Sequence, residues 1–420
     1  MQYPRPRKTR MPRRPAYQPA RRHLALAGPA WLLLPRWAHG NEGRPPAPCA
    51  RWPLWEAYLA HFVQADGRVI DDQHATRYTT SEGQAYTLFF ALVANDRDRF
   101  DTLLQWTERH LAGGDLHDRL PGWRWGRHDD GRWTLIDANS AADADLWLAH
   151  TLFEAARLWK QPRYGGLAYA LLSRVKEQEI VTLPGLGPML LPAPLGFVLG
   201  PGLWRLNPSY LALHQLRAFQ RIDPSGPWQA LADNTLTLLR GACTRGYAPD
   251  WVNYSAARGW HAGRDSPPLG SYDAVRCYLW AGLLAPRDPL RGALLAVLGG
   301  MRRHLEAGEA TPPQKVDTDS GLPSGESPPG FSAALLPYLQ ALGREQLLAR
   351  QWARVRRASR TEEGAAAPGC ADASPAATGL VGRPPTYYDQ VLTLFGQGAL
   401  ERRFAFDTEG RLLPAWQAAD

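Results

Sequence analysis

The sequence predicts an all-α fold in which six helical hairpins close into a double ring, an (α/α)6 barrel. Strand signals are weak, because apolar and polar residues rarely alternate and runs of β-branched residues are few. Helices that are apolar on nearly every side alternate instead with amphipathic helices. The apolar helices start at intervals of 57 to 66 residues, which one apolar helix, one amphipathic helix and two loops would fill. An irregular bundle of helices would show the same patterns and is the alternative.

The apolar helices each begin behind a polar residue, which can accept hydrogen bonds from the free backbone N–H groups of the first turn. Pro208, at the first helical position behind Asn207, strengthens the prediction that a helix begins there. The predicted helices span about residues 82–94, 143–158, 207–219, 273–284, 332–342 and 389–395. Amphipathic helices are predicted at 97–111 and 290–305, and Pro/Gly-rich loops at 308–330 and 359–385. We expect the second of these loops to be a flexible excursion.

Residues 1–40 have the composition of an export signal. The first 23 residues carry eight basic side chains and no acidic one, and an apolar stretch follows at 24–34. This stretch is too short for a membrane span and suits the apolar part of a secretory signal. Arg21 and Arg22, directly before it, are a feature of twin-arginine signals. We therefore expect a signal peptide at 1–40 and a periplasmic or secreted protein; a basic tail on a cytosolic protein is the alternative.

The net charge of +8 does not indicate a nucleic-acid-binding protein. The N-terminal tail carries all of it, since the other residues hold equal numbers of basic and acidic side chains. No later segment reaches the roughly 18 apolar residues of a membrane span, so the mature chain is expected to have none. The four cysteines, which match no metal-ligand spacing and predict neither a metal site nor a disulfide framework, are Cys49, Cys243, Cys277 and Cys370.

Acidic residues recur at the starts of the predicted apolar helices, namely Glu82, Asp143, Asp145 and Asp273. An acid that enters an apolar helix costs free energy unless it faces a cleft or a partner. Matching ends of the inner helices of a ring converge on one mouth, so we expect these acids to face one another. Such carboxyls can hydrolyse a glycosidic bond, one protonating the leaving oxygen and one activating water. Each acid alone would equally complement its helix dipole, by about 0.3–1 kcal/mol.

Aromatic side chains near the predicted loops extend this hypothesis. Flat apolar rings with polar rims suit the faces of sugar rings, although a single Trp is more often part of a core. We expect Trp125 and Tyr210 to bind substrate, and the wider aromatic set also holds Trp123, Trp204, Trp251 and Trp260. Arg276 lies three residues after Asp273 and could pair with a site carboxylate; a structural salt bridge is the alternative.

Eight segments resemble family 8 of the glycoside hydrolases, in the same order along the chain. They are DGRVIDDQHATRYTTSEGQAYTLFFALVANDRDRFD, LPGWRWG, NSAADADLWLAHTLFEAARLW, VTLPGLGPMLLP, NPSYL, SYDAVRCYLWAG, GFSAALLPYL and VLTLFGQG. The resemblance extends from about residue 49 to residue 416. It is strongest to the members of the family that accompany bacterial cellulose synthase.

The resemblance implies an (α/α)6 barrel and an inverting mechanism without metal or organic cofactor. Glu82 matches the general acid of the family and Asp273 in SYDA matches the general base. Asp143 matches the residue that holds the sugar at the cleavage point. Tyr210 and Arg276 lie where the family has residues that support this subsite.

One position departs from the family motif, which usually has Ser or Thr before the acid at position 143. This chain has Ala142 there, and therefore lacks one hydroxyl near the site but no catalytic group. We expect a single catalytic domain at 48–420 that acts as an endo-1,4-β-glucanase (cellulase, EC 3.2.1.4) on cellulose chains. The resemblance also implies a role beside the cellulose synthase and secretion complex. A chitosanase, a mixed-linkage glucanase and a non-catalytic glucan-binding scaffold are the alternatives.

Overall fold

The computed structural model describes residues 51–73, 76–359 and 379–419, which belong to one compact unit. The predicted signal peptide at 1–40 lies outside the described residues, as does most of the excursion predicted at 359–385. The two described ends of that excursion lie together, because Ser359 and Val381 form an antiparallel bridge. In the described part of the chain, no helix has the length and apolarity that a membrane crossing requires.

Six mostly buried helices form a closed cycle of contacts. Each packs against the next one in chain order, and the last packs back against the first. The six are α2 (Ser81–Val93), α4 (Ala142–Leu158), α6 (Leu213–Ile222), α8 (Val275–Leu283), α11 (Pro329–Ala341) and α13 (Tyr387–Leu400). They correspond one to one to the six apolar helices that the sequence predicts.

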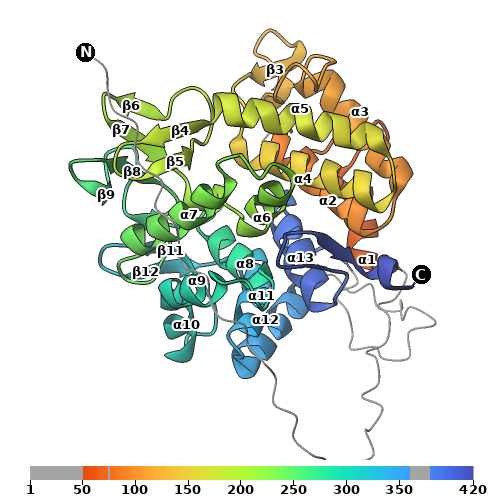
Figure 1. The fold of residues 1–420 in the computed structure, drawn as a ribbon. Helices are drawn as coiled ribbons and strands as arrows, with labels where there is room; N and C mark the ends of the chain where they lie inside the picture. The colour runs from red at the N-terminus through yellow and green to blue at the C-terminus, as the bar shows by residue number, and fades with distance from the viewer. Residues whose placement is uncertain (1–50, 74–75, 360–378, 420) are drawn as a thin grey trace, which may run out of the picture. The chain divides into compact units, whose positions relative to one another are not determined.

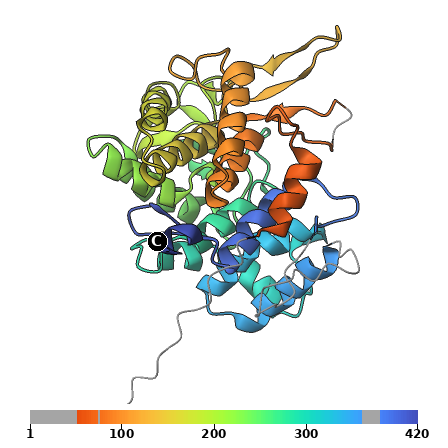
Figure 2. The same ribbon diagram turned by 90° about the vertical axis from the view of Figure 1, so that its right-hand side faces the viewer.

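A second set of helices covers this cycle from outside, and each presents one apolar face to it. They are α1 (Pro53–Phe62), α3 (Arg97–Leu111), α5 (Pro162–Gln178), α7 (Trp228–Ala242), α9 (Arg291–Val297), α10 (Gly299–Glu306) and α12 (Glu345–Ala358). In order, α3, α5, α7, α9 and α12 pack on α2, α4, α6, α8 and α11 (Figure 1). The first helix, α1, packs on the last, α13, and Figures 1 and 2 both show these two helices side by side.

The core is rich in aromatic rings where the inner helices meet. Trp147 of α4, Phe89 of α2 and Phe395 of α13 lie with their ring centroids 5.0–5.5 Å apart. Burying each ring contributes about 1.5–3 kcal/mol relative to leaving it exposed. At Gly396 of α13 a Cβ atom would overlap the carbonyl oxygen of Ala333 in α11, so only glycine allows these two helices to approach so closely.

The structure is mostly helical, as the all-α prediction expects, but it also contains short strands that the weak strand signals did not predict. In the described part of the chain, five small sheets lie in the loops between helices, and their strands have only two to five residues, too few for an alternating pattern. The strands are β1 (Thr79–Thr80), β2 (Arg124–Arg127), β3 (Trp133–Asp137), β4 (Ile180–Leu183), β5 (Gly187–Leu190), β6 (Val198–Gly200), β7 (Leu203–Leu206), β8 (Val252–Ser255), β9 (Gly259–His261), β10 (Leu269–Gly270), β11 (Pro313–Asp317), β12 (Pro323–Glu326), β13 (Phe404–Phe406) and β14 (Leu412–Pro414). The loop predicted at 308–330 contains the hairpin of β11 and β12.

Three predicted helix boundaries are also wrong. The segment behind Asn207 forms only a short 3-10 turn, η1 (Pro208–Tyr210), and α6 begins later. Asp273 lies in a turn before α8 and not in the helix itself. The helix predicted at 290–305 is divided into α9 and α10, and this division brings the Gly300 N–H within 2.8 Å of the Gly246 carbonyl oxygen.

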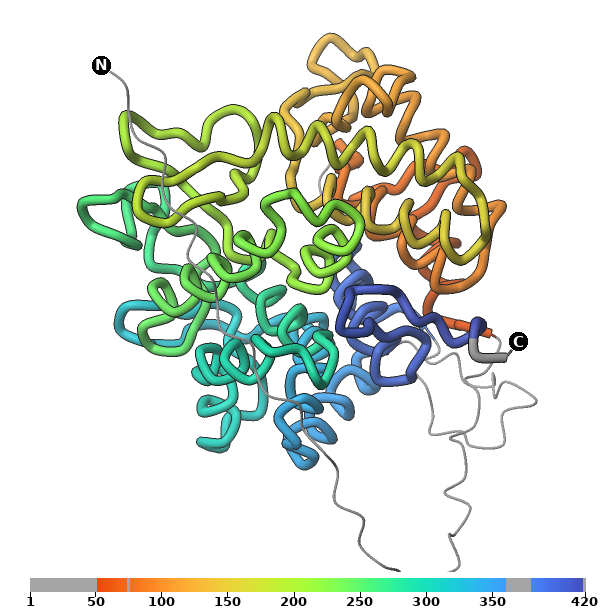
Figure 3. The backbone as a smooth tube through the Cα atoms, viewed as in Figure 1, coloured from red at the N-terminus to blue at the C-terminus, as the bar shows by residue number. Residues whose placement is uncertain are grey.

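The C-terminal hairpin of β13 and β14, dark blue in Figure 3, returns to the first half of the chain. The backbone N–H of Leu412 donates to Glu154 Oε2 of α4 at 2.9 Å, and Arg157 donates to the Leu412 carbonyl oxygen at 2.6 Å. The hairpin therefore fixes the end of the chain against α4.

Candidate active site

Glu82 is the only residue of α2 that is not fully buried. It lies in the first turn of the helix, where the hydroxyl of Thr80 accepts a hydrogen bond from the Gly83 N–H at 3.1 Å. Trp123 donates from its indole Nε1 to Glu82 Oε1 at 3.1 Å. Burial, and after it the negative charge of Asp143, raise the pKa of Glu82 to about 8. This carboxyl therefore carries a proton at neutral pH.

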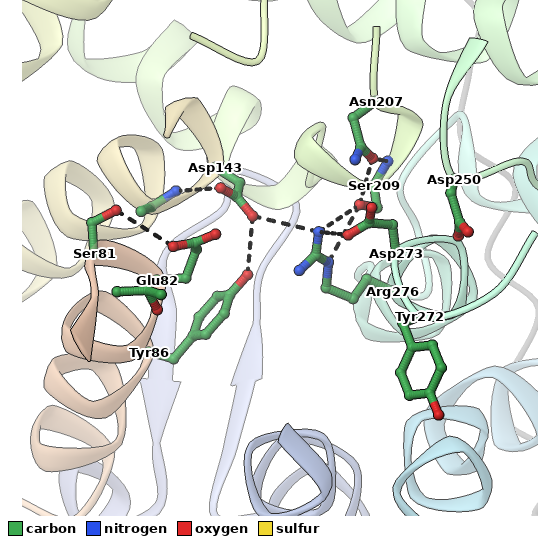
Figure 4. Close-up of polar contacts among 12 residues, drawn as sticks. Ser81, Glu82, Tyr86, Asp143, Asn207, Ser209, Asp250, Tyr272, Asp273 and Arg276 are labelled. Atoms are coloured by element: carbon green, nitrogen blue, oxygen red, sulfur yellow. Dashed lines mark hydrogen bonds and ion pairs between the residues drawn. The ribbon is translucent and has the colours of Figure 1, made fainter. Parts of the chain in front are cut away.

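Asp143 lies in the first turn of α4 and is buried. Its Oδ2 accepts a hydrogen bond from the Tyr86 hydroxyl at 3.3 Å and lies 3.6 Å from Arg276 Nη2. Burial raises the pKa of Asp143 to about 6, and the charge of Arg276 opposes this rise. Tyr86 follows Glu82 by one helical turn, so α2 directs both side chains towards Asp143 (Figure 4).

Arg276 connects the two sides of the site. This buried guanidinium donates from Nη2 to Asp273 Oδ1 at 2.9 Å and to the Ser209 hydroxyl at 2.8 Å, in addition to its contact with Asp143. The side chain of Asp273 keeps 29% of its surface exposed, so it is open to a water molecule or a ligand. Figure 4 shows Arg276 and Asp143 between Glu82 and Asp273.

Tyr210 belongs to the same site. It ends η1, and the Arg276 guanidinium lies over its ring at 5.6 Å from the centroid. The ring of Trp251 lies 6.3 Å away from that of Tyr210. The structure therefore brings together five of the six residues that the sequence predicts for the site: Glu82, Asp143, Tyr210, Asp273 and Arg276.

The sixth, Trp125, does not join them. It stacks on Trp133 at 5.1 Å and packs edge-on against Trp106 of α3 at 5.3 Å, next to the Arg68 guanidinium. Trp123 is the tryptophan that contacts Glu82, although it lies only two residues earlier. The pairing of β2 with β3 has an irregular register between residues 124 and 125, which re-aims the side chains on either side of it.

Asp145 also departs from the prediction that the four acids face one another. It is wholly buried beside Glu179, and burial followed by the charge of Glu179 raises its pKa. Burial raises the pKa of Glu179 to about 8, and its Oε1 accepts a hydrogen bond from the Ser140 hydroxyl at 2.5 Å. These two acids form a layer behind Asp143 and do not line the open part of the site.

Sequence reasoning missed three residues that contact the site. Tyr86 donates to Asp143, Ser209 accepts from Arg276, and Asp250 accepts hydrogen bonds from Ser271 and Ala274 on either side of Asp273. The spacing of four residues between Glu82 and Tyr86 could have indicated the first of them. Ser209 and Asp250 contact residues that lie far away in the chain, so no local pattern would have found them.

The arrangement suits acid–base chemistry. A carboxyl that is protonated at neutral pH lies across the site from a partly exposed carboxylate that Arg276 contacts through a charge-assisted hydrogen bond. When the surroundings of two carboxyls differ in this way, one can donate a proton while the other accepts one.

Comparison with known families places this site in context. Residues 46–402 match the family that is described as glycosyl hydrolases family 8. The chain belongs to glycosyl hydrolase family 8. Among the curated relatives of this family 8 hydrolase, a protein named endoglucanase from Xanthomonas axonopodis pv. citri is 46% identical over 372 residues, covering 89% of this chain and 91% of the relative. Another endoglucanase, from Escherichia coli O157:H7, is 42% identical over 365 residues, which cover 87% of this chain and 91% of that protein.

Solved structures of the family share the fold of this family 8 hydrolase. The endo-1,4-D-glucanase from Vibrio fischeri superposes with a TM-score of 0.76 at 36% identity and covers 87% of this chain and 100% of its own. An endo-beta-1,4-glucanase from Acetobacter xylinum superposes with a TM-score of 0.63 at 24% identity, covering 83% of this chain and 96% of that one, and supports the fold alone.

Proposed function

We propose that this protein is an endo-1,4-β-glucanase that cuts internal bonds of cellulose chains with inversion at the anomeric carbon. One observation carries the proposal. A member of glycosyl hydrolase family 8 holds a protonated Glu82 and a partly exposed Asp273 on opposite sides of Asp143 and Arg276. Relatives that are 42–46% identical over most of the chain are named endoglucanase.

In the proposed mechanism Glu82 is the general acid. Its raised pKa keeps the proton on the carboxyl at neutral pH, so it can protonate the glycosidic oxygen as the bond to the leaving sugar breaks. The Trp123 indole donates to Glu82 Oε1, which orients the carboxyl and leaves Oε2, 3.5 Å from the Ser81 hydroxyl, to carry the proton. Asp143, in contact with Tyr86 and Arg276, holds the sugar at the cleavage point, and Tyr210 supports it under the guanidinium.

Asp273 is the general base. It accepts a proton from a water molecule, and the resulting hydroxide attacks the anomeric carbon from the face opposite the leaving group. Inverting enzymes keep the two carboxyls about 6.5–9.5 Å apart so that this water fits. Arg276 contacts both Asp273 and Asp143. Arg276 and Asp143 lie between the acid and the base in Figure 4, so Glu82 and Asp273 do not contact each other directly there.

We also propose that the fold is an (α/α)6 barrel over residues 48–420. The closed cycle of contacts from α2 through α13 and back to α2 supports this architecture, as does the outer helix that covers each inner one. In a barrel of this kind the first turns of α2 and α4 and the turn before α8 lie at one end, which explains how acids from three distant segments meet.

The setting proposed for the enzyme is the periplasm or the exterior of the cell, beside the machinery that secretes cellulose. The basic and apolar segments at 1–40 support export, and the resemblance supports the association with the synthase. Fractionation of cells that produce the full chain tests the location. Export predicts a shortened protein in the periplasm or the medium, whereas a full-length cytoplasmic product would contradict it.

Viscosity loss of carboxymethyl cellulose, measured together with reducing-end release, tests the activity. The unmodified enzyme is expected to reduce viscosity quickly while it releases few ends, and both Glu82→Gln and Asp273→Asn are expected to abolish this. Proton NMR of the first product anomer tests inversion. A folded enzyme that leaves cellulose intact but degrades chitosan or mixed-linkage glucan would replace the cellulase assignment.

A further inference from the structure

A second carboxylate lies directly behind the turn that carries Asp273. Asp250 is 8% exposed and precedes β8 in the chain. Its Oδ1 accepts hydrogen bonds from the Ser271 N–H at 2.7 Å and the Ala274 N–H at 2.8 Å, and its Oδ2 accepts one from the Ser271 hydroxyl at 2.5 Å. All three donors belong to residues 271–274, the turn that carries Asp273 into α8. Figure 4 shows Asp250 beside this turn.

The backbone draws the two segments together as well. The Asp250 N–H donates to the Leu269 carbonyl oxygen at 2.7 Å. At Gly270 a Cβ atom would overlap the carbonyl oxygen of Ala248, so the close approach requires glycine at that position. On another side of the turn, the Tyr388 hydroxyl donates to the Tyr272 carbonyl oxygen at 2.6 Å. The position of Asp273 therefore depends on contacts that reach it from two other parts of the chain.

The three hydrogen bonds from Asp250 to the turn of residues 271–274, here called the clamp, do not require a negative charge. An asparagine could accept both backbone hydrogen bonds through its Oδ1 and exchange a hydrogen bond with the Ser271 hydroxyl through its amide. A buried carboxylate is costly without a cation, and the described contacts of the Asp250 carboxylate are with two backbone N–H groups and the Ser271 hydroxyl. The charged and titratable groups around the turn are Asp143, Arg205, Tyr210, Asp273, Arg276, Cys277 and Tyr388.

We propose that Asp250 is a positioning residue for the general base, which fixes the turn of Asp273 by its hydrogen bonds. The proposal rests on the assignment of Asp273 as base in the proposed function. Asp250 itself does not contact the substrate in this proposal. Burial, and after it the charge of Asp273, raise the pKa of Asp250, which is the sign expected for two carboxyls that repel each other.

Two substitutions test the clamp. Asp250→Ala removes it, and kcat is expected to fall about 10- to 100-fold with KM changed less than about threefold, since displacing a catalytic group by about 1 Å costs roughly 100-fold. Asp250→Asn keeps the hydrogen bonds, so its kcat is expected to stay within about threefold of that of the unmodified enzyme.

Asp389→Asn is the matched control. Asp389 is also a buried carboxylate that accepts hydrogen bonds from a distant backbone N–H, that of Gly330 at 3.0 Å, and from the hydroxyl of Thr386 at 3.0 Å. It makes no contact with Glu82, Asp143 or Asp273 among the described hydrogen bonds and ion pairs. Its substitution is expected to leave both kcat and KM within about twofold of the values of the unmodified enzyme. Melting temperatures of all variants show which of them keep the fold.

Several results would overturn the proposal. The proposal fails if a folded Asp250→Ala enzyme keeps kcat within about twofold of the unmodified enzyme, or if Asp250→Asn loses as much kcat as Asp250→Ala. An equal loss in Asp389→Asn would attribute the effect to general destabilisation. Asp273→Asn distinguishes failure of the proposed function, because an active Asp273→Asn enzyme would contradict the assignment of the base itself.

Discussion

Asp143→Asn is expected to move the basic limb of the pH–rate profile to lower pH. The pKa of Glu82 is raised from 4.5 to about 8, which corresponds to about 5 kcal/mol in favour of the protonated carboxyl at 1.36 kcal/mol for each unit. Burial is the larger cause and Asp143 the second. Removing the charge of Asp143 leaves the burial in place, so we expect the limb to fall by about one pH unit and not to return to 4.5.

The assay is kcat/KM against pH on a soluble cello-oligosaccharide, because this quantity reports the free enzyme. The loss of a sugar contact at Asp143 also lowers kcat/KM at every pH, but only the charge effect moves the basic limb. Asp145→Asn is the matched control on the same helix, since Asp145 is buried beside Glu179 and is not among the groups that shift Glu82. A basic limb that stays in place in Asp143→Asn, or that moves equally in Asp145→Asn, would refute the reasoning.

Three further changes test other parts of the structure. Trp123→Phe removes the hydrogen bond that lowers the pKa of Glu82, so the basic limb is expected to move to higher pH, and an unchanged limb would contradict the contact. Glu179→Gln should flatten the loss of melting temperature between about pH 4.5 and pH 8. Because the pKa of Glu179 is raised to about 8 in the folded state, its contribution to stability is complete below about pH 4.5 and is lost as pH rises through 8. Gly396→Ala forces a Cβ atom onto the Ala333 carbonyl, and urea unfolding should show a loss of about 1–3 kcal/mol; an unchanged midpoint would show that the helices can separate.

The helical part of the fold could be predicted because its signals are long and repeated. Each apolar helix extends over at least two turns, and six of them at similar spacing indicate a repeat. The five small sheets escaped prediction because strands as short as Thr79–Thr80 are determined by their partners and not by their own sequence. The break at Leu298 likewise depends on the contact of Gly300 with Gly246, which lies more than 50 residues earlier.

The candidate site was predictable where residues share a helix or a motif. Glu82, Asp143 and Asp273 lie at corresponding helix starts, and Arg276 follows Asp273 by three residues. Trp125 illustrates the limit of such reasoning. Two tryptophans two residues apart would lie on one face of a regular strand, but the irregular register between them directs only Trp123 towards Glu82.

The contact between α13 and α2 has a consequence for the order in which the chain can fold. About 300 residues separate these two helices. At roughly 5–20 residues per second, a ribosome needs about 15–60 s to synthesise this intervening stretch. Throughout that time the apolar face of α2 that α13 later covers has no native neighbour. The face of α11 that α13 covers is likewise exposed from the synthesis of α11 until that of α13. The cycle therefore completes only after α13 is made, and a nascent chain stopped before residue 387 would expose to chaperones and proteases the apolar faces of α1, α2 and α11 that α13 covers.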